Sequence, residues 1–101
     1  MHVHEAQRAA YSLDMRICES RNQTWSPFVA LTDVLEEAGE VADVVKNLEG
    51  YAPHHEPIPR ERLASELSDL LWSVFVLAGM YGLDLDAAFK RTLESYEARF
   101  L

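Results

Sequence analysis

Cysteine, glycine, proline and basic residues are all scarce in this sequence of 101 residues. Cys18 is the single cysteine, so no disulfide can form within the chain, and we expect a reducing, cytoplasmic location. The four glycines and four prolines are too few for the many tight turns of a β-sandwich or a β-barrel. The sequence has nine Lys and Arg residues and 17 Asp and Glu residues, which gives a net charge of −8. Such an acidic chain is unsuited to nonspecific nucleic-acid binding or to an anionic membrane surface, and we expect neither partner.

Long apolar runs are also missing. The longest, residues 70–80, is interrupted by a serine and a glycine. It falls short of the roughly 20 apolar residues that a membrane-spanning helix needs. The chain is 49% apolar and 26% charged, which is the balance of an ordinary soluble globular domain, and its length suits one domain over residues 1–101.

Breaks in the helical pattern predict an all-α protein with four helices. Ser26 suits an N-cap and Pro27 suits the first helical position, so they begin a helix that we expect to end before Gly50. Residues 50–59 hold three of the four prolines and predict a loop. Asp84 suits the N-cap of the last helix. The expected helices are 5–20, 27–48, 60–81 and 85–99, and their short connections favour a four-helix bundle.

The third expected helix is polar in its first two turns and then apolar nearly all round. A helix without a polar face is buried on every side. The other three helices of the same chain could bury residues 70–80, or a second copy of the chain could do so. We expect the second copy, because a chain this short buries only a modest share of its surface alone. The sequence therefore predicts a homo-oligomer, a dimer or a tetramer, formed through the apolar part of this helix.

The second expected helix carries a concentration of acidic residues. Five carboxylates share an arc of about 120° on its helical wheel. They are Asp33, Glu36, Glu37, Glu40 and Asp43. Like charges four residues apart repel one another, and Lys46 is the only cation near them. A solvated acidic face is one interpretation of this pattern, and a cation site is the other.

A second acidic pair favours the cation site. Glu66 and Asp69 lie three residues apart on the third expected helix, directly before the apolar run. Two antiparallel helices that each offer such a pair can direct four carboxylates into one space. A pocket of hard oxygen ligands suits Mg²⁺, with Mn²⁺ as a possible substitute. A di-iron site is disfavoured because the Glu-x-x-His motif that it needs does not occur in the sequence.

These acidic motifs have a familiar spacing. The segments LEEAGEVADVVK, ELSDLLWSVFVLAGMYGLDLDAAF and YEARF resemble the MazG-like nucleotide pyrophosphohydrolases over residues 25–100. The resemblance implies Mg²⁺-dependent hydrolysis of an NTP or dNTP to the monophosphate and pyrophosphate, in housecleaning of the nucleotide pool. It also implies the roles of the acids. Glu37, Glu40, Glu66 and Asp69 match the metal ligands of the family. Glu36 and Glu37 are the catalytic candidates. Glu36 would either support the metal ligands or activate the attacking water.

The resemblance also implies substrate contacts. Trp25 matches a region that stacks a base in the family, although an aromatic staple at the helix entry is an equal interpretation. Lys90, Arg91 and Arg99 are the candidate phosphate ligands.

One departure from the family lies near the C-terminus. Leu93 and Ser95 stand where the family often has an Asn and a Lys that hold phosphates. A catalytically weak or inactive relative that binds nucleotides or another protein is therefore an alternative function. A plain helical dimerisation module is a third.

Overall fold

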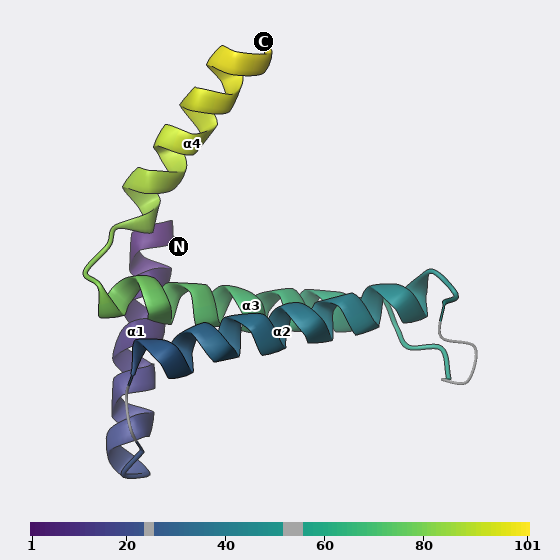
Figure 1. The fold of residues 1–101 in the computed structure, drawn as a ribbon, viewed down its shortest axis with the longest axis horizontal. Coiled ribbons are helices and arrows are strands. Elements are labelled where there is room, and N and C mark those ends of the chain that lie inside the picture. The colour runs from purple at the N-terminus through teal and green to yellow at the C-terminus, as the bar shows by residue number, and fades with distance from the viewer. Residues whose placement is uncertain (24–25, 52–55) are drawn as a thin grey trace. The chain divides into compact units, whose positions relative to one another are not determined.

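Four α-helices make up the regular structure of the described part of this protein (Figure 1). The structure is a computed structural model that describes residues 1–23, 26–51 and 56–101, and these residues contain no strand. The helices are α1 (Val3–Ser20), α2 (Pro27–Leu48), α3 (Glu61–Met80) and α4 (Leu85–Phe100). The prediction of an all-α protein with four helices is thus confirmed. The four-helix bundle and its oligomerisation through the third helix stay predictions.

Two compact units divide the chain. One comprises Met1–Trp25 and Phe75–Leu101, and the other comprises Ser26–Val74. The second unit therefore contains α2 and the larger part of α3, and each unit is described by itself below.

Local signals at both ends set the length of α2. The Ser26 hydroxyl accepts a hydrogen bond from the Phe28 amide at 3.2 Å, and Pro27 occupies the first helical position, where it removes no hydrogen bond. At the other end Gly50 takes a positive φ of 80°, which lets the Tyr51 amide reach back to the Lys46 carbonyl at 2.8 Å.

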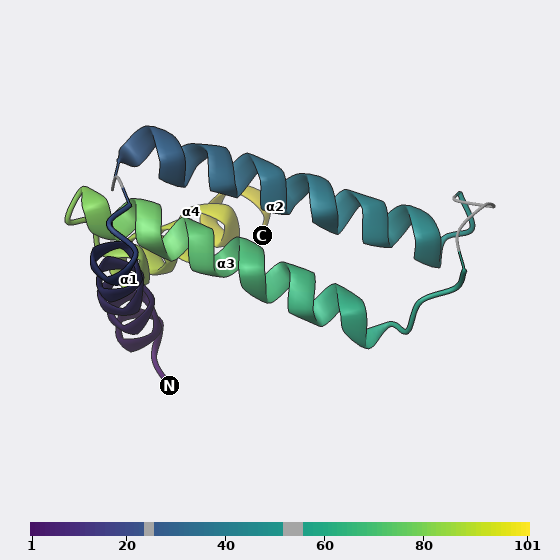
Figure 2. The same cartoon turned by 90° about the horizontal axis from the view of Figure 1, so that it is seen from below.

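Within the second unit, α2 and α3 run antiparallel and lie side by side (Figures 1 and 2). Positions that are buried or half-buried recur along both helices at steps of three and four residues, the spacing by which paired helices interlock. On α2 they are Ala30, Val34, Glu37, Val41, Val44 and Leu48, and on the first half of α3 they are Leu63, Glu66 and Leu70. We call these positions the α2–α3 seam. Carboxylates therefore occupy two seam positions that an ordinary helix pair fills with apolar side chains.

In the first unit α1 packs closely against the last part of α3. A Cβ atom added at Gly79 would overlap the ring of Tyr11, so glycine is needed for this approach. The Gln7 side-chain amide donates to the Leu83 carbonyl and accepts from the Leu85 amide at 3.0 Å. These contacts fix the turn between α3 and α4 against α1.

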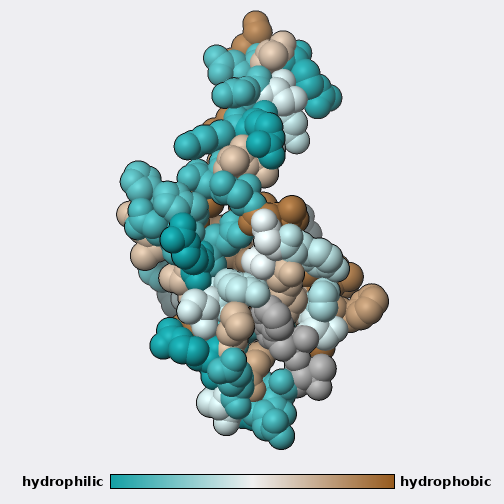
Figure 3. Space-filling view, turned by 90° about the vertical axis from the view of Figure 1, so that its left-hand side faces the viewer, coloured by the Kyte–Doolittle hydropathy of each residue, from teal (hydrophilic) through white to brown (hydrophobic). Residues whose placement is uncertain are grey.

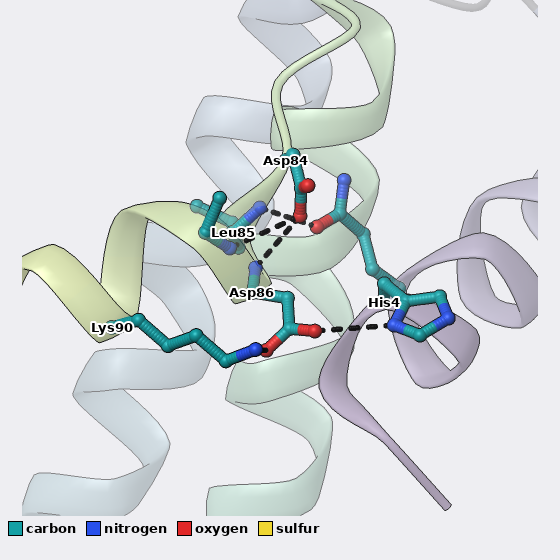
Figure 4. A network of polar contacts seen from close by, with 7 residues as sticks. His4, Asp84, Leu85, Asp86 and Lys90 are labelled. Atoms are coloured by element: carbon teal, nitrogen blue, oxygen red, sulfur yellow. Dashed lines mark hydrogen bonds and ion pairs between the residues drawn. The ribbon is translucent and has the colours of Figure 1, made fainter.

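The start of α4 is held by a small polar network (Figure 4). The Asp84 carboxylate caps the helix by accepting from the amides of Asp86 and Ala87 at 3.0 and 3.2 Å. Asp86 in turn lies 3.1 Å from Nδ1 of His4 and 3.9 Å from Nζ of Lys90. The network accounts for the helix start and for its tie to α1.

The apolar run of α3 is partly buried within the chain. Ser73, Phe75, Val76 and Ala78 are all buried. By length and composition α3 also qualifies as a membrane-spanning helix, but core helices of soluble proteins pass the same test. Its carboxylates would be costly in hydrocarbon, so this is a weak indication.

Several apolar side chains are exposed on α4. They recur at helical spacing and are between 54% and 69% exposed. They are Phe89, Leu93, Tyr96 and Phe100. Figure 3 shows apolar residues among hydrophilic ones along this helix.

Candidate metal centre

Three carboxylates converge between α2 and α3. Glu37 and Glu40 come from one face of α2, and Glu66 comes from α3. One oxygen from each lies within 4.8 Å of the other two. The pairing of the helices explains the convergence, because Glu37 and Glu66 occupy seam positions and Glu40 is one turn from Glu37. Both helices therefore contribute carboxylates to the cluster.

Two oxygens of this cluster are buried without a hydrogen-bond partner. They are Oε2 of Glu37 and Oε2 of Glu66. Glu66 is only 6% exposed, and its other oxygen, Oε1, accepts a hydrogen bond from Nε of Arg62 at 3.1 Å. Buried carboxylates are costly unless they are paired or coordinate a metal ion. The unpartnered oxygens therefore mark a position that a cation would stabilise.

The charges of the cluster act on one another. A hydrogen bond with Glu66, available to the protonated form of Glu40, raises the pKa of Glu40, and the negative charges of Glu37 and Glu66 raise it further. A proton on Glu40 thus relieves in part the repulsion among these carboxylates, and a bound divalent cation would relieve it further.

The donor set fits a hard divalent cation. All three side chains offer carboxylate oxygens, and among the described residues no histidine or cysteine joins them. Oxygen ligands suit Mg²⁺ and Mn²⁺, and Mg²⁺ is commonly held by a few carboxylates while water and phosphate oxygens complete its shell. Glu37, Glu40 and Glu66 would hold such an ion.

The other predicted acidic residues lie outside this close group. Asp69 follows Glu66 by one turn of α3 and is exposed, and Glu36 is exposed on α2. Asp33 and Asp43 are exposed as well. The structure thus brings together three of the four predicted metal ligands.

The predicted substrate residues fall outside the unit that contains the cluster. Lys90, Arg91 and Arg99 are exposed on α4. The Arg99 guanidinium lies 4.9 Å from the ring centre of Phe100, and Lys90 lies beside Asp86. Trp25 is outside the described residues. The roles of these four residues toward a substrate stay predictions.

Arg62 is a residue that the sequence analysis did not single out. It lies one turn before Glu66 on α3, and its guanidinium contacts the buried carboxylate. Its spacing of four residues from Glu66 was the available signal, since such pairs lie on one face of a helix.

The fold and the cluster define an all-helical protein with an acidic centre between two antiparallel helices. The sequence model of the MazG nucleotide pyrophosphohydrolase domain matches residues 27–100. The chain belongs to this family, as its motifs predicted, and the match includes α2, α3 and α4 with all three carboxylates of the cluster.

A curated relative is consistent with this assignment. The chain is 32% identical over 89 residues to a protein of Bacillus subtilis (strain 168) described as uncharacterized protein YvdC. The alignment covers 81% of this chain and 84% of the relative. No solved structure gave a significant match.

Proposed function

We propose that this protein hydrolyses a nucleoside triphosphate, either NTP or dNTP, to the monophosphate and pyrophosphate with the help of Mg²⁺. The observation that carries the proposal is the buried Oε2 of Glu66, which has no partner and belongs to a cluster with Glu37 and Glu40. Membership of the MazG family supports the reaction type. The physiological role we propose is housecleaning of the cytoplasmic nucleotide pool.

The acidic residues divide into ligands and a base. Glu37, Glu40 and Glu66 would hold the ion, and Asp69, one turn from Glu66, is the fourth ligand in this proposal. When bound, Mg²⁺ supplies charge stabilisation to the phosphate oxygens. Mn²⁺ is the expected substitute because it accepts the same oxygen ligands. The exposed Glu36 is free to accept the proton of the attacking water, a role that Glu37 would otherwise perform.

Substrate contacts come from other segments in this proposal. Lys90, Arg91 and Arg99 are exposed cations that suit phosphate oxygens, and Trp25 suits a stacked base. Apolar side chains left half-exposed, such as Leu67 and Leu71 on α3, support a homo-oligomer.

A second function is favoured by one observation. Leu93 and Ser95 are both exposed on α4, where the family often has phosphate-binding side chains. A protein that holds Mg²⁺ and a nucleotide but turns it over weakly would fit these residues.

Pyrophosphate release from the common ribo- and deoxyribonucleoside triphosphates tests the proposal. The assay compares the wild type, Glu66→Gln and Glu49→Gln with and without Mg²⁺. Glu49→Gln is the matched control because it removes the same charge from an exposed position beyond the end of α2.

We expect release that requires the metal, survives in Glu49→Gln and is lost in Glu66→Gln. Absence of release in a folded protein that still binds Mg²⁺ would favour the binding function. A protein that binds no divalent cation would overturn both.

A further inference from the structure

The contact between Arg62 and Glu66 joins an exposed cation to a buried carboxylate. Nε of Arg62 lies 3.1 Å from Oε1 of Glu66, and the two side chains are 57% and 8% exposed. Glu66 cannot move far, because it lies in the α2–α3 seam. The hydrogen bond therefore fixes the orientation of a carboxylate whose position is already fixed.

Helix stability does not account for this arginine. Arg62 lies in the first turn of α3, where the helix dipole disfavours a positive charge. Arg62 also precedes Glu66 in the sequence, and an ion pair four residues apart stabilises a helix less in this order than when the acid comes first. The effect of the arginine is therefore to be sought at Glu66 itself.

The arginine occupies one oxygen of Glu66 and leaves the other. Oε1 accepts from Arg62, whereas Oε2 has no partner and belongs to the carboxylate group of the cluster. Glu37 and Glu40 on α2 have no cation beside them among the described residues. Glu66 is thus the one member of the cluster with a single oxygen left to offer.

This asymmetry discriminates between divalent cations. Mg²⁺ requires a near-octahedral shell with ligands at about 2.0–2.1 Å, which a fixed single oxygen satisfies. Ca²⁺ takes six to eight oxygens at about 2.3–2.6 Å and often binds both oxygens of one carboxylate. A guanidinium on Oε1 opposes that bidentate mode.

We propose that Arg62 is a positioning residue that favours Mg²⁺ over Ca²⁺ by restricting Glu66 to one metal-binding oxygen. The inference rests on the proposed function, since it concerns the same metal centre. It assigns to Arg62 a role in ion selection that is separate from the hydrolysis itself.

Calorimetric titration of the metal-free protein with MgCl₂ and, separately, with CaCl₂ tests the inference without any turnover. The quantity compared is the ratio of the Ca²⁺ Kd to the Mg²⁺ Kd. Removal of a nearby positive charge strengthens the binding of both ions, and the ratio cancels this common effect. Arg60→Gln is the matched control, because Arg60 is an exposed arginine two residues earlier with no contact to the cluster among the described residues.

We expect the ratio to fall by about tenfold in Arg62→Gln, since changes beside metal ligands alter metal affinity by about 10–100-fold. In Arg60→Gln the ratio should change less than about twofold. Arg62→Met, which keeps an unbranched stem and removes the donor, should lower it equally. Thermal unfolding of each variant confirms that it is folded. An unchanged ratio in both Arg62 variants, or an equal change in Arg60→Gln, would overturn the inference. A wild type that binds neither ion would instead overturn the proposed metal centre.

Discussion

Glu37 on α2 and Glu66 on α3 meet across the α2–α3 seam, and each has a buried oxygen without a hydrogen-bond partner. Both residues occupy positions that apolar side chains fill elsewhere along the same pair of helices. Their burial therefore lowers the stability of the metal-free protein and provides binding energy for a cation.

Mg²⁺ should stabilise the folded protein. A ligand at ten times its Kd adds about 1.4 kcal/mol to the free energy of unfolding. For a domain of this size that raises Tm by about 6–10 °C. Differential scanning fluorimetry with and without MgCl₂ measures the shift. Glu66→Gln should lose it and Glu49→Gln should keep it, and an equal shift in both would place the ion elsewhere.

Replacing a seam carboxylate by an apolar side chain should stabilise the metal-free protein. Glu37→Leu restores the apolar seam pattern and removes a buried oxygen that has no partner. We expect the free energy of unfolding to rise by about 1 kcal/mol, because apolar replacement of buried charges is often stabilising. The measurement is urea unfolding in the presence of a chelator.

The neighbouring residue supplies the control for this substitution. Glu36→Leu makes the same chemical change one position away, at an exposed site outside the seam, and should bring no gain. Glu37→Leu should also abolish the Mg²⁺-induced rise in Tm. A loss of stability in Glu37→Leu would show that the seam does not accept an apolar side chain at this position.

The sequence predicted the helices better than the site. Ser26, Pro27 and Gly50 are local signals, and each acts in the structure as its type suggests. The acidic helix was identified by a wheel that places Glu36, Glu37 and Glu40 on one arc. That wheel cannot separate a seam position from an exposed one, because burial depends on how the facing helix is rotated. Contacts of the α4 cations with a substrate depend on tertiary placement, which no local pattern specifies.

Arg62 was missed for a related reason. Its pairing with Glu66 has meaning only once Glu66 is known to be buried, since an exposed pair four residues apart contributes little. The spacing in the sequence predicts the contact between Arg62 and Glu66. Only the packing of α2 on α3 shows that Glu66 is buried and that the contact therefore matters.

Two glycines should respond to alanine in opposite directions. A Cβ at Gly79 would overlap the Tyr11 ring, whereas a Cβ at Gly39 on α2 would meet no atom within 4 Å. Gly79→Ala should therefore destabilise the protein by about 1–3 kcal/mol through overpacking. Gly39→Ala should stabilise it by about 0.5–1 kcal/mol through helix propensity. Urea unfolding measures both, and a smaller penalty for Gly79→Ala in a Tyr11→Leu background would tie the effect to that ring.

The raised pKa of Glu40 gives the stability of the metal-free protein a defined pH dependence. The pKa of Glu40 is raised above its ordinary value of 4.5 in the folded state. Between these two pKa values the folded state therefore binds more protons than the unfolded state. This contribution to stability is therefore complete below about pH 4.5 and is lost as the pH rises through the raised pKa.

Glu40→Gln cannot ionise, so with a chelator present it should have a higher Tm than the wild type near neutral pH, and the difference should vanish near pH 4. With Mg²⁺ the order should reverse, because the ion stabilises only the ionised cluster of the wild type. A pH series of thermal unfolding curves with and without Mg²⁺ measures both effects, and a wild type that exceeds Glu40→Gln in the chelator at neutral pH would contradict the repulsion among these three carboxylates.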